Sequence, residues 1–233
     1  MTESKTAPRK SDAKTGPKPY RLYFAPTPNG QKIAIFFEEA HIPYTLRRMD
    51  LSAGDQHKPA FLKLNPNGKM PALVDPHGPG GTAFGLFESG AILLYLGRKH
   101  GAFYPLTEVE RSRVEQWLFF QMASLGPMSG QAYHFSKLAR DEPARAAYGR
   151  ERYGTEVRRL YRVMDGHLKD REWFADRISI ADFAVYPWIF PGLVGEEAWE
   201  GCKHLRDWHT RMGARKGVQR GMAVGEADSG EAS

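Results

Sequence analysis

The hydrophobic pattern changes character part-way along the chain. Up to about residue 101, short apolar runs alternate with turn residues, and beyond that point long stripes at helical spacing take over. Residues 20–25 alternate and are rich in aromatics, which is typical of a strand, whereas Ile33, Phe36 and Phe37 follow Gly30 at helical spacing. The expected elements follow the order β-α-β-α-β-β-α, with strands at 20–25, 43–51, 70–75 and 83–87 and helices at 30–40, 58–64 and 89–101.

From Pro105 onward the pattern predicts helices and no strand. Apolar stripes run through 108–131 and 142–170, and a further helix opens on Ser179 with Asp182 three residues later, which approximates a capping box. We therefore expect an α/β unit followed by an all-α domain. The expected divisions are a disordered basic tail at 1–18, an α/β domain at 19–101, a linker at 102–107, an all-helical domain at 108–222 and a disordered tail at 223–233.

The chain carries an excess of positive charge. Of 233 residues, 33 are Lys or Arg and 27 are Asp or Glu, which gives a formal net charge of +6. A basic balance raises the possibility of nucleic-acid binding, but no RRM, KH, zinc-finger or helix-turn-helix pattern accompanies it. Many arginines alternate with acids on helical stretches, as solvated faces do, and a site for a small polyanion accounts for them equally well. We expect no nucleic-acid partner.

Cysteine usage and hydropathy point to the cytoplasm. The single cysteine, Cys202, excludes an internal disulfide framework and fits a reducing compartment. No apolar run approaches the roughly 18 residues of a membrane span, and the N-terminal residues lack the apolar core of a secretory signal. We expect no membrane partner. Because Cys202 is far in sequence from the motifs below and has no C-x-x-C context, we interpret it as a spectator thiol.

Three short motifs carry the candidate chemistry. The turn A-P-T-P-N-G places Thr27 and Asn29 between a strand and a helix, where side chains and free amides are exposed. Pro71, in N-P-N-G-K-M-P, opens a strand although proline cannot donate to a sheet ladder. Ser89 begins a helix directly after Glu88, where free amides and the helix dipole favour an anion. Taken singly, these patterns also fit an ordinary turn with Asn29 as cap, an edge strand and a capping pair.

Together and in this order, the motifs resemble the cytosolic glutathione transferases, and most closely the bacterial Nu-class members of the disulfide-reductase type. The resemblance spans about residues 20–220 and is carried by LYFAPTPNGQKI, FLKLNPNGKMPALVD, FESGAILLYL, QWLFFQM with LGPM, ERY and SIADFAVYPW. It implies a thioredoxin-like N-terminal domain, an all-helical C-terminal domain, a symmetric homodimer and glutathione or glutathione disulfide as the bound co-substrate.

The resemblance also implies roles for individual residues. Thr27 and Asn29 are expected to hold the sulfur of glutathione, while Glu88 faces its α-ammonium and Ser89 binds its γ-glutamyl α-carboxylate. The thiolate is the reactive form of a thiol, and a hydrogen-bond donor or helix N-terminus aimed at sulfur favours that form. A turn without cysteine can therefore support thiol chemistry when the substrate brings the sulfur.

Further binding residues follow from the same resemblance. A cis Met70–Pro71 bond turns the Met70 backbone toward an extended peptide such as glutathione. Gln56 matches a glutamine that contacts glutathione, although its surroundings, SAGDQHKP, differ from those of the relatives. Lys69 is placed to pair with the glycine carboxylate, its other interpretation being a solvated lysine. Arg152, in ERY, matches an arginine that reaches the ligand from the helical domain.

Several alternatives stay open at the level of sequence. Arg150 and Arg158 are near enough to Arg152 to take its place. Tyr23 matches the tyrosine with which many animal glutathione transferases activate sulfur, but the T-P-N-G turn after it matches the bacterial type, so we rank it below Thr27 and Asn29. His134 follows L-G-P-M-S-G-Q and is a candidate for the wall of the acceptor pocket.

The implied function is reduction of small disulfides by bound glutathione, with weak conjugating or peroxidase activity alongside. One glutathione thiolate attacks the disulfide, and a second glutathione resolves the mixed disulfide. The first alternative is conjugation of glutathione to an electrophile, and the second is a non-catalytic binding protein, which would need no intact turn beside the sulfur. We expect no metal site, since His204 and His209 are five residues apart and not at the i, i+4 spacing of a helical metal pair.

Overall fold

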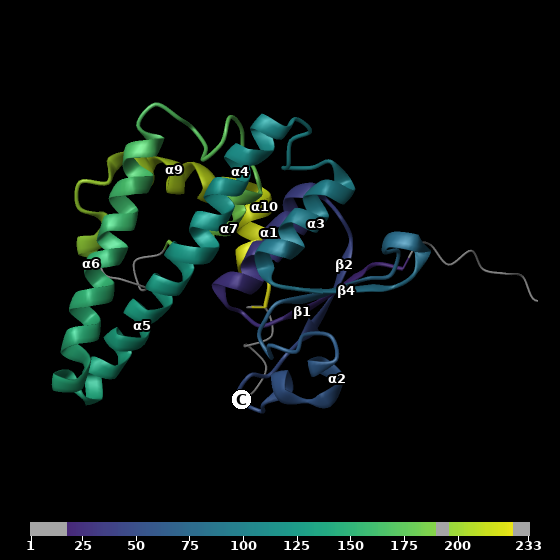
Figure 1. Ribbon diagram of the computed structural model, residues 1–233, viewed down its shortest axis with the longest axis horizontal. Helices are drawn as coiled ribbons and strands as arrows, with labels where there is room; N and C mark the ends of the chain where they lie inside the picture. The colour runs from purple at the N-terminus through teal and green to yellow at the C-terminus, as the bar shows by residue number, and fades with distance from the viewer. Residues whose placement is uncertain (1–17, 190–195, 226–233) are drawn as a thin grey trace, which may run out of the picture.

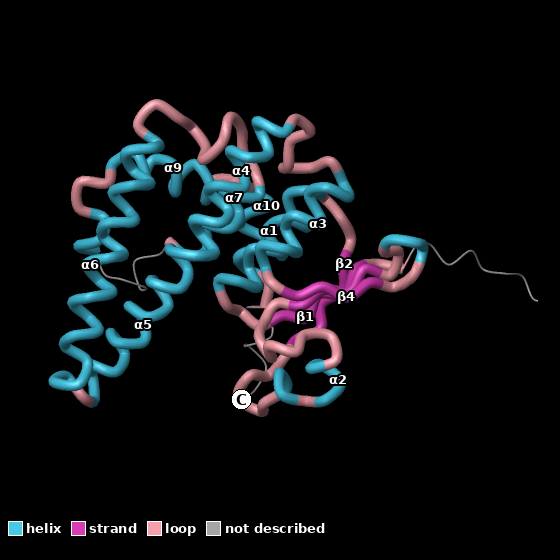
Figure 2. Tube along the Cα trace, in the orientation of Figure 1, coloured by secondary structure: helices cyan, strands magenta, loops and turns pink. Residues whose placement is uncertain are grey.

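A computed structural model describes residues 18–189 and 196–225 and divides into a sheet-containing half and a helical half (Figures 1 and 2). Most of the expected tails at 1–18 and 223–233 lies outside the described residues. The first half has strands β1 (Tyr20–Phe24), β2 (Tyr44–Arg48), β3 (Ala72–Asp75) and β4 (Phe84–Phe87), and helices α1 (Pro28–Ala40), α2 (Pro59–Leu62) and α3 (Ser89–His100). Short 3₁₀ turns η1 (Asp55–His57) and η2 (Pro79–Gly81) complete it.

The four strands form one mixed sheet in the order β2-β1-β3-β4. β1 pairs parallel with β2 and antiparallel with β3, and β3 pairs antiparallel with β4. A parallel pair needs a crossover connection, which α1 supplies between β1 and β2. Helices α1 and α3 lie on one side of the sheet and α2 on the other (Figure 1). The expected β-α-β-α-β-β-α order and the thioredoxin-like fold of this half are confirmed.

The second half is helical throughout its described residues, as expected. Its elements are α4 (Glu108–Phe120), a π-helical segment η3 (Gln121–Leu125), α5 (Gly126–Asp141), α6 (Pro143–Leu168), α7 (Ile180–Val185), η4 (Tyr186–Trp188), η5 (Glu196–Trp199), α9 (Lys203–Gly213) and α10 (Lys216–Ala223). The long helices α5 and α6 run side by side and extend away from the sheet (Figure 2).

The predicted capping box begins α7. The Ser179 side chain accepts from the α7 backbone, and the Asp182 side chain accepts from the Ser179 backbone N–H at 2.9 Å. Asp182 is fully buried and also accepts from the indole N–H of Trp208 at 2.9 Å. The capping group therefore ties α7 to α9 as well as starting its own helix.

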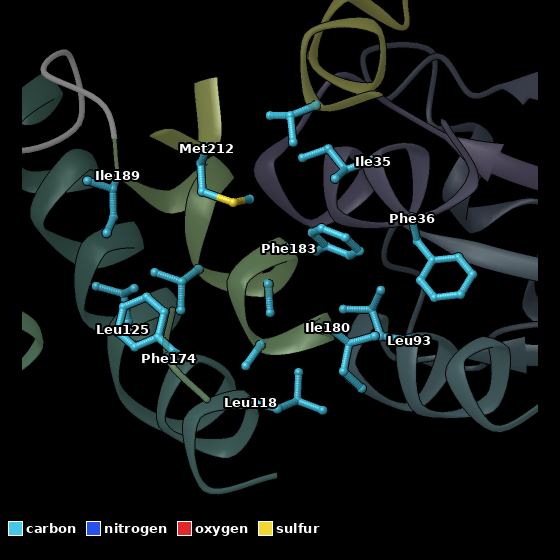
Figure 3. Close-up of a cluster of buried hydrophobic side chains, with 14 of the residues drawn as sticks. Ile35, Phe36, Leu93, Leu118, Leu125, Phe174, Ile180, Phe183, Ile189 and Met212 are labelled. Carbon is cyan, nitrogen blue, oxygen red and sulfur yellow. The ribbon is translucent and has the colours of Figure 1, made fainter. Parts of the chain in front are cut away.

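One hydrophobic core joins the two halves. Figure 3 shows Phe36 of α1 and Leu93 of α3 beside Phe183 and Ile180 of α7, and these side chains are fully buried. The ring centroids of Phe36 and Phe183 lie 6.4 Å apart in an edge-to-face arrangement. The halves share a packed interior, so residues from both can form one site.

The last helix of the described chain also packs on the first. Gly221 of α10 faces Ile35 of α1 so closely that a Cβ at position 221 would lie 2.6 Å from the Ile35 backbone. The Val218 backbone N–H donates to the Glu39 carboxylate at 3.1 Å. Although α10 belongs to the helical half in sequence, it covers a helix of the thioredoxin-like half.

Candidate active site

A pocket of about 510 Å³ opens where the β1–α1 turn, the segment before β3, the start of α3 and η4 meet. Most of the residues predicted from sequence border this one cavity: Thr27, Asn29, Gln56, Lys69, Met70, Pro71, Glu88 and Ser89. Seven further residues complete its wall: Pro28, Leu51, His57, Asn65, Asn67, Gly68 and Trp188. The sheet-containing half supplies all of these except Trp188.

The β1–α1 turn presents the start of α1 to the pocket. Thr27 is the N-cap, with its hydroxyl accepting from the Gly30 backbone N–H at 3.4 Å, and Pro28 occupies the first helical turn. The expectation that the helix starts at Gly30 with Asn29 as a possible cap was wrong. Proline has no N–H to leave unpaired and its fixed φ suits the first helical position, so the helix begins two residues earlier.

Asn29 is held by a residue from the helical half. The indole Nε1–H of Trp188 donates to the Asn29 side-chain oxygen at 3.0 Å. Indole is a donor and never an acceptor, so the oxygen of the amide has to face the ring. Both N–H donors of the Asn29 amide are thereby left to a ligand in the pocket. Trp188 is the last residue of the SIADFAVYPW motif, and its sequence context gave no sign of this contact.

The segment before β3 is shaped by its own hydrogen bonds. The Asn65 amide donates to the Lys69 carbonyl at 2.6 Å, and its oxygen accepts from the Asn67 backbone N–H at 3.0 Å. The Met70–Pro71 peptide bond is cis, as the resemblance implied. Both residues border the pocket, so the edge-strand interpretation of Pro71 alone is insufficient.

The start of α3 forms the opposite wall. Glu88 is its N-cap residue, with the uncommon positive φ of 67°, and its side chain makes no capping hydrogen bond. Such backbone conformations cost about 1–3 kcal/mol and cluster at functional sites. The Glu88 carboxylate is therefore available to the pocket and does not serve the helix. Ser89, the first helical residue, is buried beside it.

Gln56 and Lys69 lie at the rim contributed by the sheet-containing half. The Gln56 amide donates to the Leu51 carbonyl at 3.3 Å, while its oxygen is buried without a hydrogen-bond partner in the described structure. A buried acceptor left unpaired costs free energy, which a ligand N–H would recover. The Lys69 side chain is exposed.

Three candidates lie outside the cavity wall. Tyr23 packs its ring on Phe61, with centroids 5.7 Å apart, which agrees with an aromatic residue of the strand interior. Arg152 and His134 are exposed on α6 and α5 respectively. The alternative arginines of α6 do not border the cavity either.

A buried lysine beneath the pocket was not anticipated. Lys32 of α1 is fully buried, and its ammonium donates to the Ser89 hydroxyl at 3.2 Å. Burial lowers the pKa of Lys32 to about 7, and the nearby Glu88 carboxylate acts in the opposite direction. Its place among apolar residues on the helical pattern of α1 gave no signal in the sequence.

The described residues contain neither a metal-binding group nor a membrane-spanning helix. No group of three or more His, Cys, Asp or Glu side chains in 18–189 and 196–225 is arranged to hold a metal ion. Within the same ranges, no helix combines the length and the apolar character needed to cross a membrane.

Comparison with known proteins identifies the family. Residues 18–98 match the model of the glutathione S-transferase N-terminal domain, and residues 128–216 match that of the C-terminal domain. The chain belongs to the glutathione S-transferase family. This glutathione S-transferase is 43% identical over 220 residues to the disulfide-bond oxidoreductase YfcG of Escherichia coli K12, an alignment that covers 90% of this chain and 96% of that protein.

Solved structures of relatives share the fold. A glutathione transferase from Pseudomonas putida, solved with one glutathione disulfide bound per subunit, is 37% identical, with a TM-score of 0.82 and coverage of 92% of this chain and 94% of that one. One from Burkholderia graminis, solved with two glutathione molecules per subunit, is 39% identical, with a TM-score of 0.83 and coverage of 89% of each chain.

Proposed function

We propose that this glutathione S-transferase reduces small disulfides with glutathione as its thiol substrate. The names and bound ligands of its relatives support this activity, and so does a pocket that gathers the residues expected to contact glutathione. The observation that carries the proposal is the Trp188–Asn29 hydrogen bond, because it leaves the Asn29 amide as a donor for sulfur.

The roles within the pocket follow from the groups that each residue offers. Thr27 and Asn29 contact the glutathione sulfur, and a donor aimed at sulfur lowers the pKa of the thiol. Glu88 pairs with the α-ammonium, and Ser89 with the α-carboxylate. The remaining contacts to the tripeptide come from the backbone of Met70 beside Pro71, the free oxygen of Gln56 and the ammonium of Lys69.

All the reacting sulfur atoms come from the substrates, so the proposed reaction needs no thiol of the protein. The bound thiolate attacks one sulfur of the disulfide, a new S–S bond forms, and the departing thiolate takes a proton from solvent. The thiolate of a second glutathione then attacks the glutathione sulfur of the mixed disulfide, the old S–S bond breaks, and glutathione disulfide and the second substrate thiolate leave, the latter taking a proton from solvent. Arg152 is proposed to attract this second glutathione or a substrate carboxylate. Cys202 takes no part, because it is buried and burial raises the pKa of its thiol.

We also propose that the protein acts as a symmetric homodimer. Phe84 and Phe87 are exposed on β4, and the Phe84 ring packs on Tyr95, with centroids 5.7 Å apart, which lines a hollow of about 550 Å³ between α3 and the residues that follow β3. Exposed aromatic side chains at a sheet edge are typical of a face covered by another subunit. Light scattering at twice the 26.3 kDa chain mass is the expected result, and the mass of one chain would contradict the proposal.

Reduction of 2-hydroxyethyl disulfide by glutathione tests the activity. We expect Cys202→Ala to retain turnover and Asn29→Ala to lose about tenfold to a hundredfold in kcat/KM, because a hydrogen bond to a charged group contributes about 1.5–3 kcal/mol. If the unmodified protein binds glutathione and conjugates it to an electrophile but does not reduce the disulfide, conjugation replaces reduction as the proposed activity. Loss of turnover in Cys202→Ala alone would contradict a mechanism without a protein thiol.

A further inference from the structure

The buried Lys32 ammonium has hydrogen-bond partners, but no described carboxylate is in contact with it. It donates to the Ser89 hydroxyl, to the Gln121 side-chain oxygen and to the Met122 sulfur, the last at 3.3 Å. An ammonium has three N–H donors, and these three acceptors match them. All three acceptors are neutral, and no described carboxylate forms a salt bridge with Lys32. Charges buried in this way are normally paired, because desolvation of an ion is costly.

The surroundings of Lys32 contain one ionisable group that acts on it. Glu88, which precedes α3, exerts a Coulombic attraction without contact. The η3 segment presents the neutral Gln121 and Met122, and η4 presents the ring of Trp188, whose centroid lies 6.0 Å from the ammonium. Of the three groups that accept from the ammonium, Ser89 is the one that also borders the pocket, so a ligand charge placed there would act on Lys32 through it.

The Ser89 hydroxyl connects the Lys32 ammonium to the pocket, because it contacts the first and borders the second. In its ammonium form lysine only donates, so the Ser89 oxygen accepts from Lys32 and the Ser89 hydroxyl proton stays free to be donated. The Ser89 hydroxyl donates to the Met122 sulfur at 3.6 Å, and sulfur is a weak acceptor. A carboxylate at the N-terminal end of α3 would be a stronger hydrogen-bond acceptor for that proton.

We propose that Lys32 is a positioning residue that recognises the γ-glutamyl α-carboxylate through Ser89, with the ligand supplying the counter-charge of the buried ammonium. The inference rests on the proposed function, since it takes glutathione as the ligand. Lys32 does not touch the ligand, but it fixes Ser89 as a donor and provides the positive potential beneath it.

Two ligands that differ only in this carboxylate test the proposal. S-Methylglutathione has no thiol to ionise, and its analogue with 4-aminobutyryl in place of γ-glutamyl lacks only the α-carboxylate. We expect the unmodified protein to prefer S-methylglutathione by about tenfold to a hundredfold, and Lys32→Met to lose most of that preference. Lys63→Met, at an exposed position outside the pocket, is the matched control and should keep it.

The outcomes separate the two proposals. Equal binding of both ligands by a protein that still reduces disulfides would overturn the role of Lys32 alone. So would a Lys32→Met variant that weakens both ligands equally, because that is the behaviour of a purely structural brace. Failure of the unmodified protein to bind S-methylglutathione would overturn the proposed function and this inference with it.

A measurement on the unmodified protein remains decisive if Lys32→Met does not fold. A carboxylate near Ser89 raises the Lys32 pKa from about 7, so binding takes up protons near neutral pH and weakens as pH rises through that range. Calorimetry in two buffers of different ionisation enthalpy should show proton uptake with S-methylglutathione and less with the 4-aminobutyryl analogue. Equal uptake with both ligands would overturn the proposal.

Discussion

The orientation of the Asn29 side-chain amide is fixed by Trp188, a residue of the helical half of the chain. The Trp188 indole fixes which end of the amide faces the pocket, although the two ends have nearly the same shape. Without that constraint the amide can turn its oxygen toward the sulfur, and an oxygen opposes the thiolate. The direction of one hydrogen bond therefore separates a site that activates sulfur from one that repels it.

Trp188→Phe tests this directly, because it keeps an aromatic wall and removes the N–H. We expect kcat/KM for disulfide reduction to fall about tenfold, since a neutral hydrogen bond contributes about 1 kcal/mol and its loss also misaligns Asn29. The pKa of bound glutathione, followed by thiolate absorbance, should rise. Trp173→Phe, whose ring faces Arg211 outside the pocket, is the control. An unchanged thiol pKa in Trp188→Phe would contradict the role of this bond.

The predicted site residues that border the pocket share a local signal. Thr27, Asn29 and Ser89 stand beside a turn or a helix start, and Pro71 opens a strand, so their positions follow from neighbours in sequence. Lys32 and Trp188 gave no such signal, because their role arises where α1, α3 and η4 meet in space.

At the scale of elements, the α5–α6 pair depends on one small residue. Gly149 of α6 is buried against Phe135 of α5, where an added Cβ would lie 2.3 Å from the ring. That ring cannot withdraw easily, because it stacks on Tyr153 with centroids 5.5 Å apart. Arg152 also lies on α6, so the packing of α6 on α5 determines the position of Arg152 as well.

Gly149→Ala should therefore destabilise the fold by about 1–3 kcal/mol through overpacking. Gly166→Ala is the matched control in the same helix, because nothing lies within 4 Å of the added Cβ. That control should stabilise by up to about 1 kcal/mol, the difference in helix propensity between glycine and alanine. Urea unfolding measures both, and equal effects of the two substitutions would contradict the packing argument.

Element types were easier to predict than the contacts between elements. The alternation of 20–25 and the helical spacing of 108–131 are properties of single segments, and both were read correctly. The placement of α10 on α1 was not predictable in this way, since it depends on the fit of Gly221 against Ile35 across the whole chain.

At the scale of the whole molecule, burial of titratable groups makes stability depend on pH. Burial lowers the pKa of His167 and of His209, so near pH 6 the folded state binds fewer protons than the unfolded state. Stability from these groups is fully present above their ordinary pKa of about 6.5 and is lost as pH falls below it. Asp182, whose pKa burial raises to about 6, opposes this trend at lower pH.

We accordingly expect the free energy of unfolding to fall between pH 7.5 and pH 6. His209→Gln should make that pH dependence weaker, because it removes a titrating group. It should also lower the free energy of unfolding at every pH, because it removes the stacking on Tyr186, whose ring centroid lies 4.7 Å away. Urea titrations at several pH values measure the slope, and an equal slope in His209→Gln and the unmodified protein would contradict the assignment.

The contact between α10 and α1 also bears on how the protein is made. A ribosome adds about 5–20 residues per second, so roughly 10–35 seconds separate the emergence of α1 from that of its covering helix, which begins at Lys216. Throughout that interval the face of α1 around Ile35 lacks its cover. The newly synthesised thioredoxin-like half is therefore expected to be a client of chaperones that bind apolar surface, until α10 is released and docks.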